Sequence, residues 1–293
     1  MASLEPAAQP IACPICATPS AFSFSKSGYA IFRCPGCDFR FVHPPPSDTS
    51  HLYGEDYFHG ASRGFGYVNY EEDKVAMRSF FLVILDAIEY NLPSRGRLLD
   101  VGAATGFFLK LAAERGWAVA GLEVSDYAVR IAERSGLPVA QGTLEAARFP
   151  DNFFDAVVLL DVIEHVAEPG RLVAQVSRLL RPGGVVAINT PDTASWWARV
   201  LAERWHAYCP PEHLSYFNRS NLSRLLEASG FTVVFTVTLP KRFTPAYVFS
   251  MLHRWQGLRV WRCLEQAFKA SRLNRLSLPL NLRDNFFLIA RKR

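Results

Sequence analysis

The feature that most constrains the fold is an alternation of strand-like and helix-like segments that begins at residue 97. Short apolar runs read as buried strands, and segments with helical spacing separate them. This alternation is typical of a parallel, doubly wound α/β sheet. We expect strands at 97–102, 118–125, 137–142, 154–162, 185–191, 231–239 and 285–292, and helices over 71–91 and from near Gly106, Asp126, Pro169, Thr193 and Ser220.

A glycine-rich turn follows the first strand. The strand LLDV runs into Gly102-Ala-Ala-Thr-Gly106, whose small residues let the main chain approach a ligand closely. Glu123 stands at the end of the next strand, where a carboxylate can accept hydrogen bonds from a ribose diol. A tight turn without a ligand is the alternative. Together with Asp100 at the first strand end, the pattern favours a nucleotide-like ligand.

These residues resemble the class I S-adenosylmethionine (SAM) dependent methyltransferases, whose first motif is an acid followed by glycines. The segments GLEVSDYAVRIAE, FPDNFFDAVVLLDVIEHVAEPGRLVAQVSRLLRPGGVVAINTP and LLEASGF look like the next motifs in their usual order. The resemblance covers about residues 95–240. It implies a Rossmann-like α/β fold with a seven-stranded sheet, in which the last strand is antiparallel and lies beside the fifth.

The same resemblance implies a set of SAM-binding residues. The first turn would line the methionine and ribose end of SAM, Glu123 would bind the ribose, and the segment after the third strand would meet the adenine through Thr143, the Leu144 amide or Glu145. Asp161 would lie near the methionyl group, although Asp161 and Glu164 also read as a helix-capping pair. The implied set is Asp100, Gly102, Ala103, Gly106, Phe107, Glu123, Val124, Thr143, Leu144 and Asp161.

A candidate catalytic loop, Tyr208-Cys-Pro-Pro-Glu212-His213-Leu-Ser-Tyr216-Phe217, follows the fifth strand. A histidine with a near-neutral pKa beside a carboxylate suits general base catalysis. We therefore take His213 as the candidate base, with Glu212 and Tyr208 as its helpers. A structural histidine that fixes the loop is the alternative.

Four of the six cysteines form two pairs, Cys13-Pro-Ile-Cys16 and Cys34-Pro-Gly-Cys37. This spacing predicts a tetrahedral four-cysteine zinc site, because each CxxC turn points two thiolates at one ion. A filled set of four protein ligands indicates a structural zinc ion. Two redox dithiols or two disulfides are the alternative. Cys209 and Cys263 are interpreted as ordinary thiols.

The combination of cysteine element, methyltransferase segment and Glu-His-Leu-x-Tyr-Phe loop is similar to the deoxysugar C-methyltransferases. In that family the Glu and His, with a Tyr two places before the Glu, assist deprotonation at carbon. Here Pro210 stands at that place and the long C-terminal domain of those enzymes is absent, so O-methylation is an equal expectation. The VIEHV segment is similar to quinone-ring O-methyltransferases. The expected acceptor is a small molecule: a sugar derivative, or a lipid-linked or aromatic metabolite.

About 45 residues separate the last two expected strands, and this insertion is basic. The whole chain has a net charge of +5. Residues 240–293 hold 12 Lys or Arg and only two acidic residues, Glu265 and Asp284, whereas residues 1–239 hold 20 basic and 25 acidic residues. Two amphipathic helices are expected there. The apolar face of the first carries Tyr247, Val248, Met251, Leu252 and Trp255, and that of the second carries Val260, Trp261, Leu264 and Phe268. Residues 243–275 would form a lid, a homodimer contact or a peripheral membrane contact.

The expected organisation is a zinc-ribbon-like element at 1–46, a linker and helix at 47–94, the SAM-binding core at 95–240, the helical insertion at 241–282 and the final strand at 283–293. No charge-free apolar run reaches ~18 residues and the N-terminus lacks a secretory pattern. We expect a cytoplasmic protein, peripheral at most to the inner face of the membrane. The alternatives are RNA methylation or a non-catalytic SAM- or RNA-binding module, and the few basic residues of the ribbon argue against nucleic acid.

Overall fold

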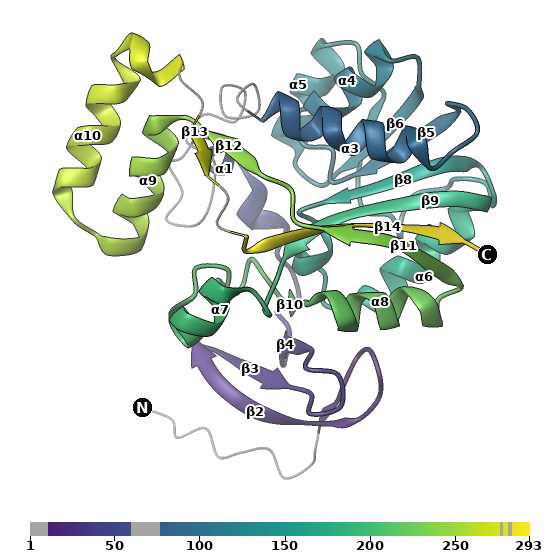
Figure 1. Cartoon of the computed structure of the whole chain (residues 1–293), viewed down its shortest axis with the longest axis horizontal. Helices are drawn as coiled ribbons and strands as arrows, with labels where there is room; N and C mark the ends of the chain where they lie inside the picture. The colour runs from purple at the N-terminus through teal and green to yellow at the C-terminus, as the bar shows by residue number, and fades with distance from the viewer. Residues whose placement is uncertain (1–10, 60–76, 276–277, 281–282) are drawn as a thin grey trace.

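The computed structural model describes residues 11–59, 77–275, 278–280 and 283–293 (Figure 1). Its centre is a seven-stranded sheet in the order β11-β14-β9-β8-β5-β6-β7. β14 runs antiparallel between β11 and β9, and the strands from β9 to β7 are parallel. The predicted fold class is therefore confirmed. The bounds are β5 Arg97–Val101, β6 Ala118–Glu123, β7 Val139–Gln141, β8 Phe154–Leu160, β9 Leu180–Pro191, β11 Phe231–Val237 and β14 Asn285–Lys292.

Helices cover both faces of this sheet (Figure 1). Alternate strand residues point to opposite faces, so Leu98 packs with one hydrophobic cluster and Leu99 with the other. One cluster joins the sheet to α3 (Arg78–Tyr90), α4 (Phe107–Glu114) and α5 (Asp126–Arg134). The other joins it to α6 (Pro169–Leu179) and α8 (Arg219–Ala228). Burial of both faces explains why the strands are continuous apolar runs.

The helix starts follow from local capping. The Ser125 hydroxyl accepts a hydrogen bond from the Ala128 N–H and begins α5, and Asn218 with Asn221 forms a capping box at α8. Ser195 caps α7 (Trp196–Leu201), which therefore begins three residues later than the predicted Thr193. The expected helix over 71–91 is described only from α3 onward, and residues 71–76 lie outside the described chain.

The N-terminal ribbon forms its own five-stranded sheet in the order β1-β2-β3-β4-β10. Four of its strands come from the first 42 residues, and the fifth, β10, comes from the segment after α7, far away in sequence. Figure 1 places this sheet beneath α7 and α8. The bounds are β1 Ile11–Ala12, β2 Pro19–Lys26, β3 Tyr29–Arg33, β4 Arg40–Val42 and β10 Ser215–Tyr216.

The insertion before β14 forms a helical hairpin that projects from the sheet (Figure 1). The ring of Phe249 stacks on Trp261 and Phe268, so the two helices pack through aromatic side chains. Among the described residues, no helix is long and apolar enough to cross a bilayer. The insertion comprises β12 (Lys241–Phe243), α9 (Pro245–Gln256), α10 (Arg259–Lys269), η4 (Arg272–Arg275) and β13 (Leu278–Leu280).

Candidate active site

A cavity of about 800 Å³ opens at the carboxyl ends of β5, β6, β7 and β8. This is the edge where ligands bind in open α/β sheets. Its walls also include η1 (Ser50–Tyr53), α1 (Glu55–His59), η2 (Ile163–His165), α7, the segment 206–213 and α9. Its volume lies within the roughly 300–1,000 Å³ of small-molecule pockets.

The turn after β5 shapes one end of the cavity. Gly102 has φ of 74°, and a Cβ atom there would lie 2.6 Å from Cγ2 of Val162, so only glycine fits. The Glu123 carboxylate accepts hydrogen bonds from the N–H groups of Ala104 and Ser125, each at 2.8 Å. Burial raises the pKa of the Glu123 carboxyl, and these two N–H groups oppose that shift. The carboxylate is held rigidly at the cavity wall.

The structure brings six of the ten predicted SAM-binding residues to this cavity: Gly102, Glu123, Val124, Thr143, Leu144 and Asp161. Asp100, Ala103, Gly106 and Phe107 are not among the residues that line it. A Cβ atom on Gly106 would lie 2.4 Å from Cδ1 of Leu137, so this glycine allows α4 to pack closely on its neighbours. Glu145 lines the cavity beside Thr143 and Leu144.

Asp161 and Glu164 do not cap a helix. The N-cap of η2 is Val162 and the N-cap of α6 is Glu168, so the capping interpretation of the pair is wrong. Asp161 has φ of 56° and its carboxylate accepts a hydrogen bond from the Asn189 amide at 2.5 Å. The Glu164 carboxylate, which is buried, accepts one from the Thr190 hydroxyl at 2.9 Å. Both acids line the cavity at the end of β8.

Glu212 and His213, two of the predicted catalytic residues, line the cavity from the loop after α7. Nδ1 of His213 lies 2.9 Å from the Ala207 carbonyl oxygen. A carbonyl only accepts hydrogen bonds, so Nδ1 carries the proton and Nε2 keeps a lone pair. Burial, assisted by neighbouring His165, lowers the pKa of His213 to about 3. The ring is therefore neutral at physiological pH, and the expected near-neutral pKa is wrong.

His165 lies against His213, and sequence reasoning did not single it out. The two rings meet edge to face with centroids 4.7 Å apart. Nδ1 of His165 lies 2.9 Å from the Glu212 carbonyl oxygen and 3.0 Å from the Tyr53 hydroxyl. Glu164, His165 and His213 each offer a ligand-type atom within 4.8 Å of the others. Burial lowers the pKa of His165, so both rings are neutral.

Tyr208 does not join Glu212 and His213 in the cavity. Its side chain is 1% exposed, and its hydroxyl accepts a hydrogen bond from the Arg40 guanidinium of ribbon strand β4. Burial raises the pKa of Tyr208, and the charge of Arg40 opposes that shift. Phe24, Trp205 and Tyr216 contact its ring edge-on. Tyr208 thus belongs to the contact between loop and ribbon.

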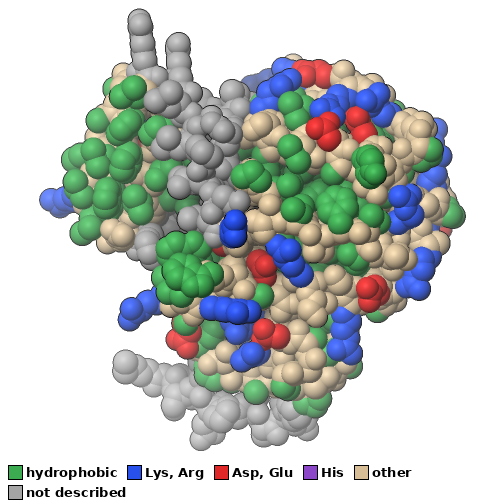
Figure 2. Space-filling view, in the orientation of Figure 1, with side chains coloured by type: hydrophobic (Ala, Val, Ile, Leu, Met, Phe, Trp, Pro, Cys, Tyr) green, Lys and Arg blue, Asp and Glu red, His purple; other side chains and the backbone are tan. Residues whose placement is uncertain are grey.

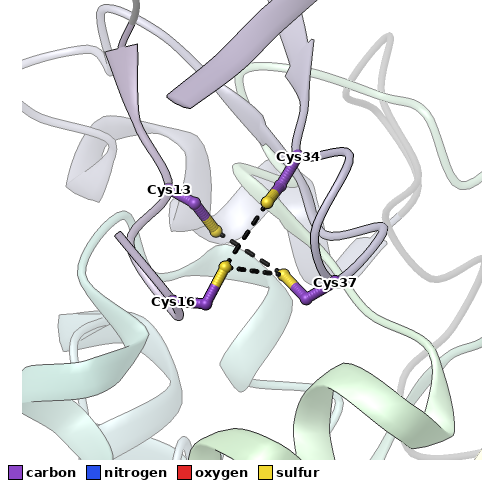
Figure 3. A group of neighbouring side chains, drawn as sticks. All are labelled: Cys13, Cys16, Cys34 and Cys37. Atoms are coloured by element: carbon purple, nitrogen blue, oxygen red, sulfur yellow. Dashed lines mark hydrogen bonds between the residues drawn. The ribbon is translucent and has the colours of Figure 1, made fainter. Parts of the chain in front are cut away.

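The four predicted cysteine ligands converge on one point (Figure 3). Sγ of Cys13 lies 3.6 Å from Sγ of Cys37, and Sγ of Cys16 lies 3.4 Å from Cys34 and 3.6 Å from Cys37. Thiolates ~2.3 Å from a shared zinc ion stand ~3.8 Å apart in a tetrahedron, so the cluster fits zinc. These distances are too long for the disulfides considered as the alternative.

The thiols of the metal-free cluster do not ionise alike. Burial raises the pKa of Cys13 to about 11. At Cys16 burial raises the pKa, but hydrogen bonds with Thr18 and Cys34 outweigh it and lower the value to about 6. Four close thiols cannot all ionise on their own, whereas a bound divalent ion stabilises every thiolate. Zinc would be held by all four cysteines and would supply folding stability to the ribbon.

Several cavity residues were not predicted as site residues. Tyr53 and Tyr57 come from an aromatic stretch before the core, and Met77 comes from the start of α3. Tyr247, Val248, Ser250, Met251 and Leu252 come from α9. Two features of the sequence could have pointed to these residues: the aromatic stretch that contains Tyr53 and Tyr57, and the apolar face of the insertion. Neither carries a motif that points to a particular ligand.

Comparison with known proteins decides the family. The family model described as a methyltransferase domain matches residues 74–235, which is more than half of the chain. The chain belongs to this methyltransferase family. Its seven-stranded sheet with an antiparallel last strand is that of the class I SAM-dependent methyltransferases.

Relatives of this methyltransferase share its central segment. A protein of Mycolicibacterium smegmatis, named as a probable S-adenosylmethionine-dependent methyltransferase, is 30% identical over 138 residues, which are 46% of this chain and 52% of the relative. The chain thus spans about half of that relative's length. A ubiquinone biosynthesis O-methyltransferase of Saccharophagus degradans is 33% identical over 158 residues, 46% of this chain and 66% of the relative.

A solved structure supports the fold of this methyltransferase. The YcgJ protein of Bacillus subtilis superposes with a TM-score of 0.51 at 19% identity, and the match covers 74% of this chain and 99% of that protein. At such low identity the likeness shows the fold alone. It does not extend to the ligand or to the reaction.

Proposed function

We propose that this protein transfers a methyl group from SAM to a hydroxyl of a small molecule. The observation that carries the proposal is a single cavity that joins two kinds of site. Glu123 and the Gly102 turn form one wall, and Glu212 and His213 form another. Membership of the methyltransferase family and the SAM-dependent relatives support SAM as the ligand of the first wall.

On the SAM side the protein aligns its ligand. Glu123, fixed by the Ala104 and Ser125 N–H groups, has lone pairs left for a ribose diol. Gly102 allows close approach of the main chain, and Thr143, Leu144 and Glu145 surround the place of the adenine. SAM, once bound, supplies an electrophilic methyl group on a sulfonium sulfur. The alignment of that group with the acceptor is the larger part of catalysis.

On the acceptor side, Nε2 of His213 is suited to remove the hydroxyl proton. A base with a pKa of about 3 does not ionise a free alcohol. However, the oxygen becomes strongly acidic while its bond to the methyl carbon forms and the sulfur–carbon bond breaks, so a neutral imidazole then takes the proton. The products are the methyl ether, S-adenosylhomocysteine and protonated His213. The imidazolium later releases the proton to water.

The lining of the acceptor side favours an aromatic or lipid-linked acceptor over a sugar derivative. Side chains from α9 and α7, including Met251, Leu252 and Leu201, give it an apolar wall. A polar end is formed by Glu212 and by the pair His206–Asp284, which is 3.1 Å apart. The withdrawal of Tyr208 from the cavity supports O-methylation over the C-methylation considered from the sequence.

In this proposal α9 acts as the cover of the acceptor. Figure 2 shows apolar side chains gathered on the lobe of α9 and α10, and Leu258 and Val260 are about half exposed there. The cavity-facing side chains of α9 support the lid over the two other roles considered for the insertion, a homodimer contact and a membrane contact. The side chain of Trp255, placed on the same helical face by the sequence pattern, lies outside the described residues.

The first experiment measures SAM binding by calorimetry. Glu123→Ala removes the hydrogen-bond acceptor of the ribose, so the Kd for SAM should rise by ~10- to 100-fold, which corresponds to ~1.5–3 kcal/mol. Glu133→Ala, at an exposed position of α5, is the matched control and should leave the Kd unchanged. Absence of SAM binding to the wild-type protein, or equal Kd values for all three proteins, would contradict the proposal.

The second experiment identifies the acceptor class. The protein is incubated with methyl-labelled SAM and with the lipid, small-molecule and RNA fractions of its host. Label in an aromatic or lipid-linked metabolite, in a bond stable to alkaline hydrolysis as expected for a methyl ether, supports the proposal. Label in RNA alone would replace it with RNA methylation.

A further inference from the structure

The loop that carries Glu212 and His213 is attached to the cysteine ribbon at both ends. We define it as the 205–217 loop. Near its start, the Arg40 guanidinium of β4 donates to the Tyr208 hydroxyl, and the Phe24 ring of β2 meets the Tyr208 ring at 5.0 Å. Lys26 of β2 also donates to the Glu203 carbonyl just before the loop, at 2.9 Å. Ribbon side chains thus anchor the beginning of the loop.

The end of the 205–217 loop is built into the ribbon sheet. β10 pairs with β4, with Ser215 opposite Phe41 and Tyr216 opposite Arg40. The Val42 N–H donates to the Leu214 carbonyl at 2.9 Å, directly after His213. Farther along, the ring of Phe217 lies 5.0 Å from Phe39, and the Asn221 amide reaches the Cys37 carbonyl at 3.4 Å. The ribbon residues involved at this end are Cys37 and residues 39–42, which follow it directly.

His213 is held between these two anchors. Its Nδ1–H donates to the Ala207 carbonyl next to Tyr208, and its own carbonyl accepts the Tyr216 hydroxyl at 2.7 Å. The rings of Tyr208 and Tyr216 lie edge-on at 4.9 Å, so the anchors also contact each other. By contrast, the hydrogen bonds of Glu123 run to Ala104 and Ser125 beside the central sheet.

We propose that the cysteine-held ribbon is a positioning element of the acceptor side, beside the hydrogen bonds that the loop makes with residues 164–166 after β8, and that Arg40 is its positioning residue. Zinc bound at the four cysteines keeps β4 in place, and β4 in turn fixes the 205–217 loop so that His213 points into the cavity. The metal is thereby needed for placing Glu212 and His213 but not for binding SAM. The effect of the ribbon on catalysis rests on the proposed function. The attachment of the loop to the ribbon rests on the contacts alone.

The variant that tests the inference is Arg40→Met, which keeps chain length and removes the donor to Tyr208. The matched control is Arg33→Met in the same ribbon, because the Arg33 side chain is 53% exposed and pairs only with Asp38 among the described residues. Hydrogen exchange with mass spectrometry compares peptides from the 205–217 loop with peptides from β5 and α4. Amide exchange reports local opening directly and requires no acceptor.

In Arg40→Met, exchange in the 205–217 loop should accelerate by ~10-fold or more while β5 and α4 exchange as in the wild type. The Kd for SAM should stay within about two-fold, since no anchor of Glu123 is touched. Arg40→Lys should restore part of the protection. Arg33→Met should match the wild type in every measurement. The zinc content, at one ion per chain in both variants, establishes that the ribbon stays folded.

The second arm removes the metal. After treatment with a chelator, exchange in the loop should rise as in Arg40→Met with SAM binding retained, and added Zn²⁺ should reverse the change. Unchanged loop protection in Arg40→Met or in metal-free protein would overturn the inference, and so would a rise of the same size in β5 and α4. These readouts do not depend on turnover, so they remain decisive if the proposed reaction is wrong. If it is right, turnover falls in Arg40→Met and not in Arg33→Met.

Discussion

The two sides of the cavity are built in different ways. The side proposed for SAM comes from one stretch of chain, because Gly102, Glu123 and Thr143 lie at the ends of three successive strands of the parallel sheet. The acceptor side is assembled from η1, the 205–217 loop, α9 and, behind the loop, the ribbon. A local motif on a rigid sheet fixes the first side, and long-range packing fixes the second.

The two sides therefore depend on different supporting contacts. Carboxyl ends of parallel strands always meet at one sheet edge, so a SAM site there needs few supporting contacts. The acceptor side needs separate supports, here a cysteine cluster below the loop and a helical hairpin above the cavity. Loss of one support should therefore change acceptor use without changing SAM binding.

The largest effect that separates the two sides is expected from His213→Gln. Glutamine keeps a donor for the Ala207 carbonyl but cannot take a proton, so turnover of the acceptor found by labelling should fall ~100-fold or more. The Kd for SAM should not change. His253→Gln is the control, because Nδ1 of His253 also pairs with a carbonyl, that of Leu258 at 2.9 Å, on the helical hairpin. Normal turnover in His213→Gln would assign the ring a purely structural role.

The pH profile sharpens this test. Burial holds the pKa of His213 at about 3, so the neutral, proton-accepting form persists as the pH falls from 8 to 5. Turnover should therefore show no inflection in that range that depends on His213. A fall near pH 6.5 that disappears in His213→Gln would mean that the ring titrates like an exposed histidine.

The sequence predicted the sheet, and it placed six of ten candidate residues at the cavity wall at the ends of β5, β6, β7 and β8, for a physical reason. Strand-to-helix turns with glycine at Gly102 and an acid at Glu123 carry their geometry within a few residues. The same holds for the two CxxC pairs, which the structure gathers into one cluster. Local patterns of this kind are readable because the contacts that stabilise them are also local.

The acceptor side was predicted less well, because its contacts are long-range. Tyr208 was assigned to catalysis since it precedes His213 closely in sequence, yet its hydroxyl points to Arg40, 168 positions earlier. The low pKa of His213 depends on burial beside His165, which lies 48 positions before it. Neither the partner nor the burial leaves a signal in the neighbouring residues.

A smaller effect, on the SAM side, is expected from Gly102→Ala. Alanine would have to adopt φ of 74°, and its Cβ would lie 2.6 Å from Val162 Cγ2. The turn should therefore shift, and the Kd for SAM should rise ~10-fold. Gly116→Ala is the control, because Gly116 has φ of 90° with no atom within 4 Å of the added Cβ. Alanine at Gly116 imposes backbone strain of about 1–2 kcal/mol without a clash. Calorimetry should therefore give a normal Kd for Gly116→Ala. An equal loss of SAM affinity in Gly102→Ala and Gly116→Ala would mean that backbone strain alone causes the effect.

The smallest effect is expected on the hairpin, from Met251→Ala. Met251 is partly buried on α9 and lines the cavity, so its truncation should remove about 1 kcal/mol of apolar contact with the acceptor. The KM for the acceptor should rise ~5-fold with kcat and the Kd for SAM nearly unchanged. Leu258→Ala, at a half-exposed position of the same hairpin, should leave all three constants unchanged if α9 is a lid. A KM that responds to Leu258 and not to Met251 would place the acceptor, or a surface that delivers it, on the outer face of the hairpin. The acceptor side would then extend beyond the cavity onto the lobe of α9 and α10, whose surface Figure 2 shows to be apolar.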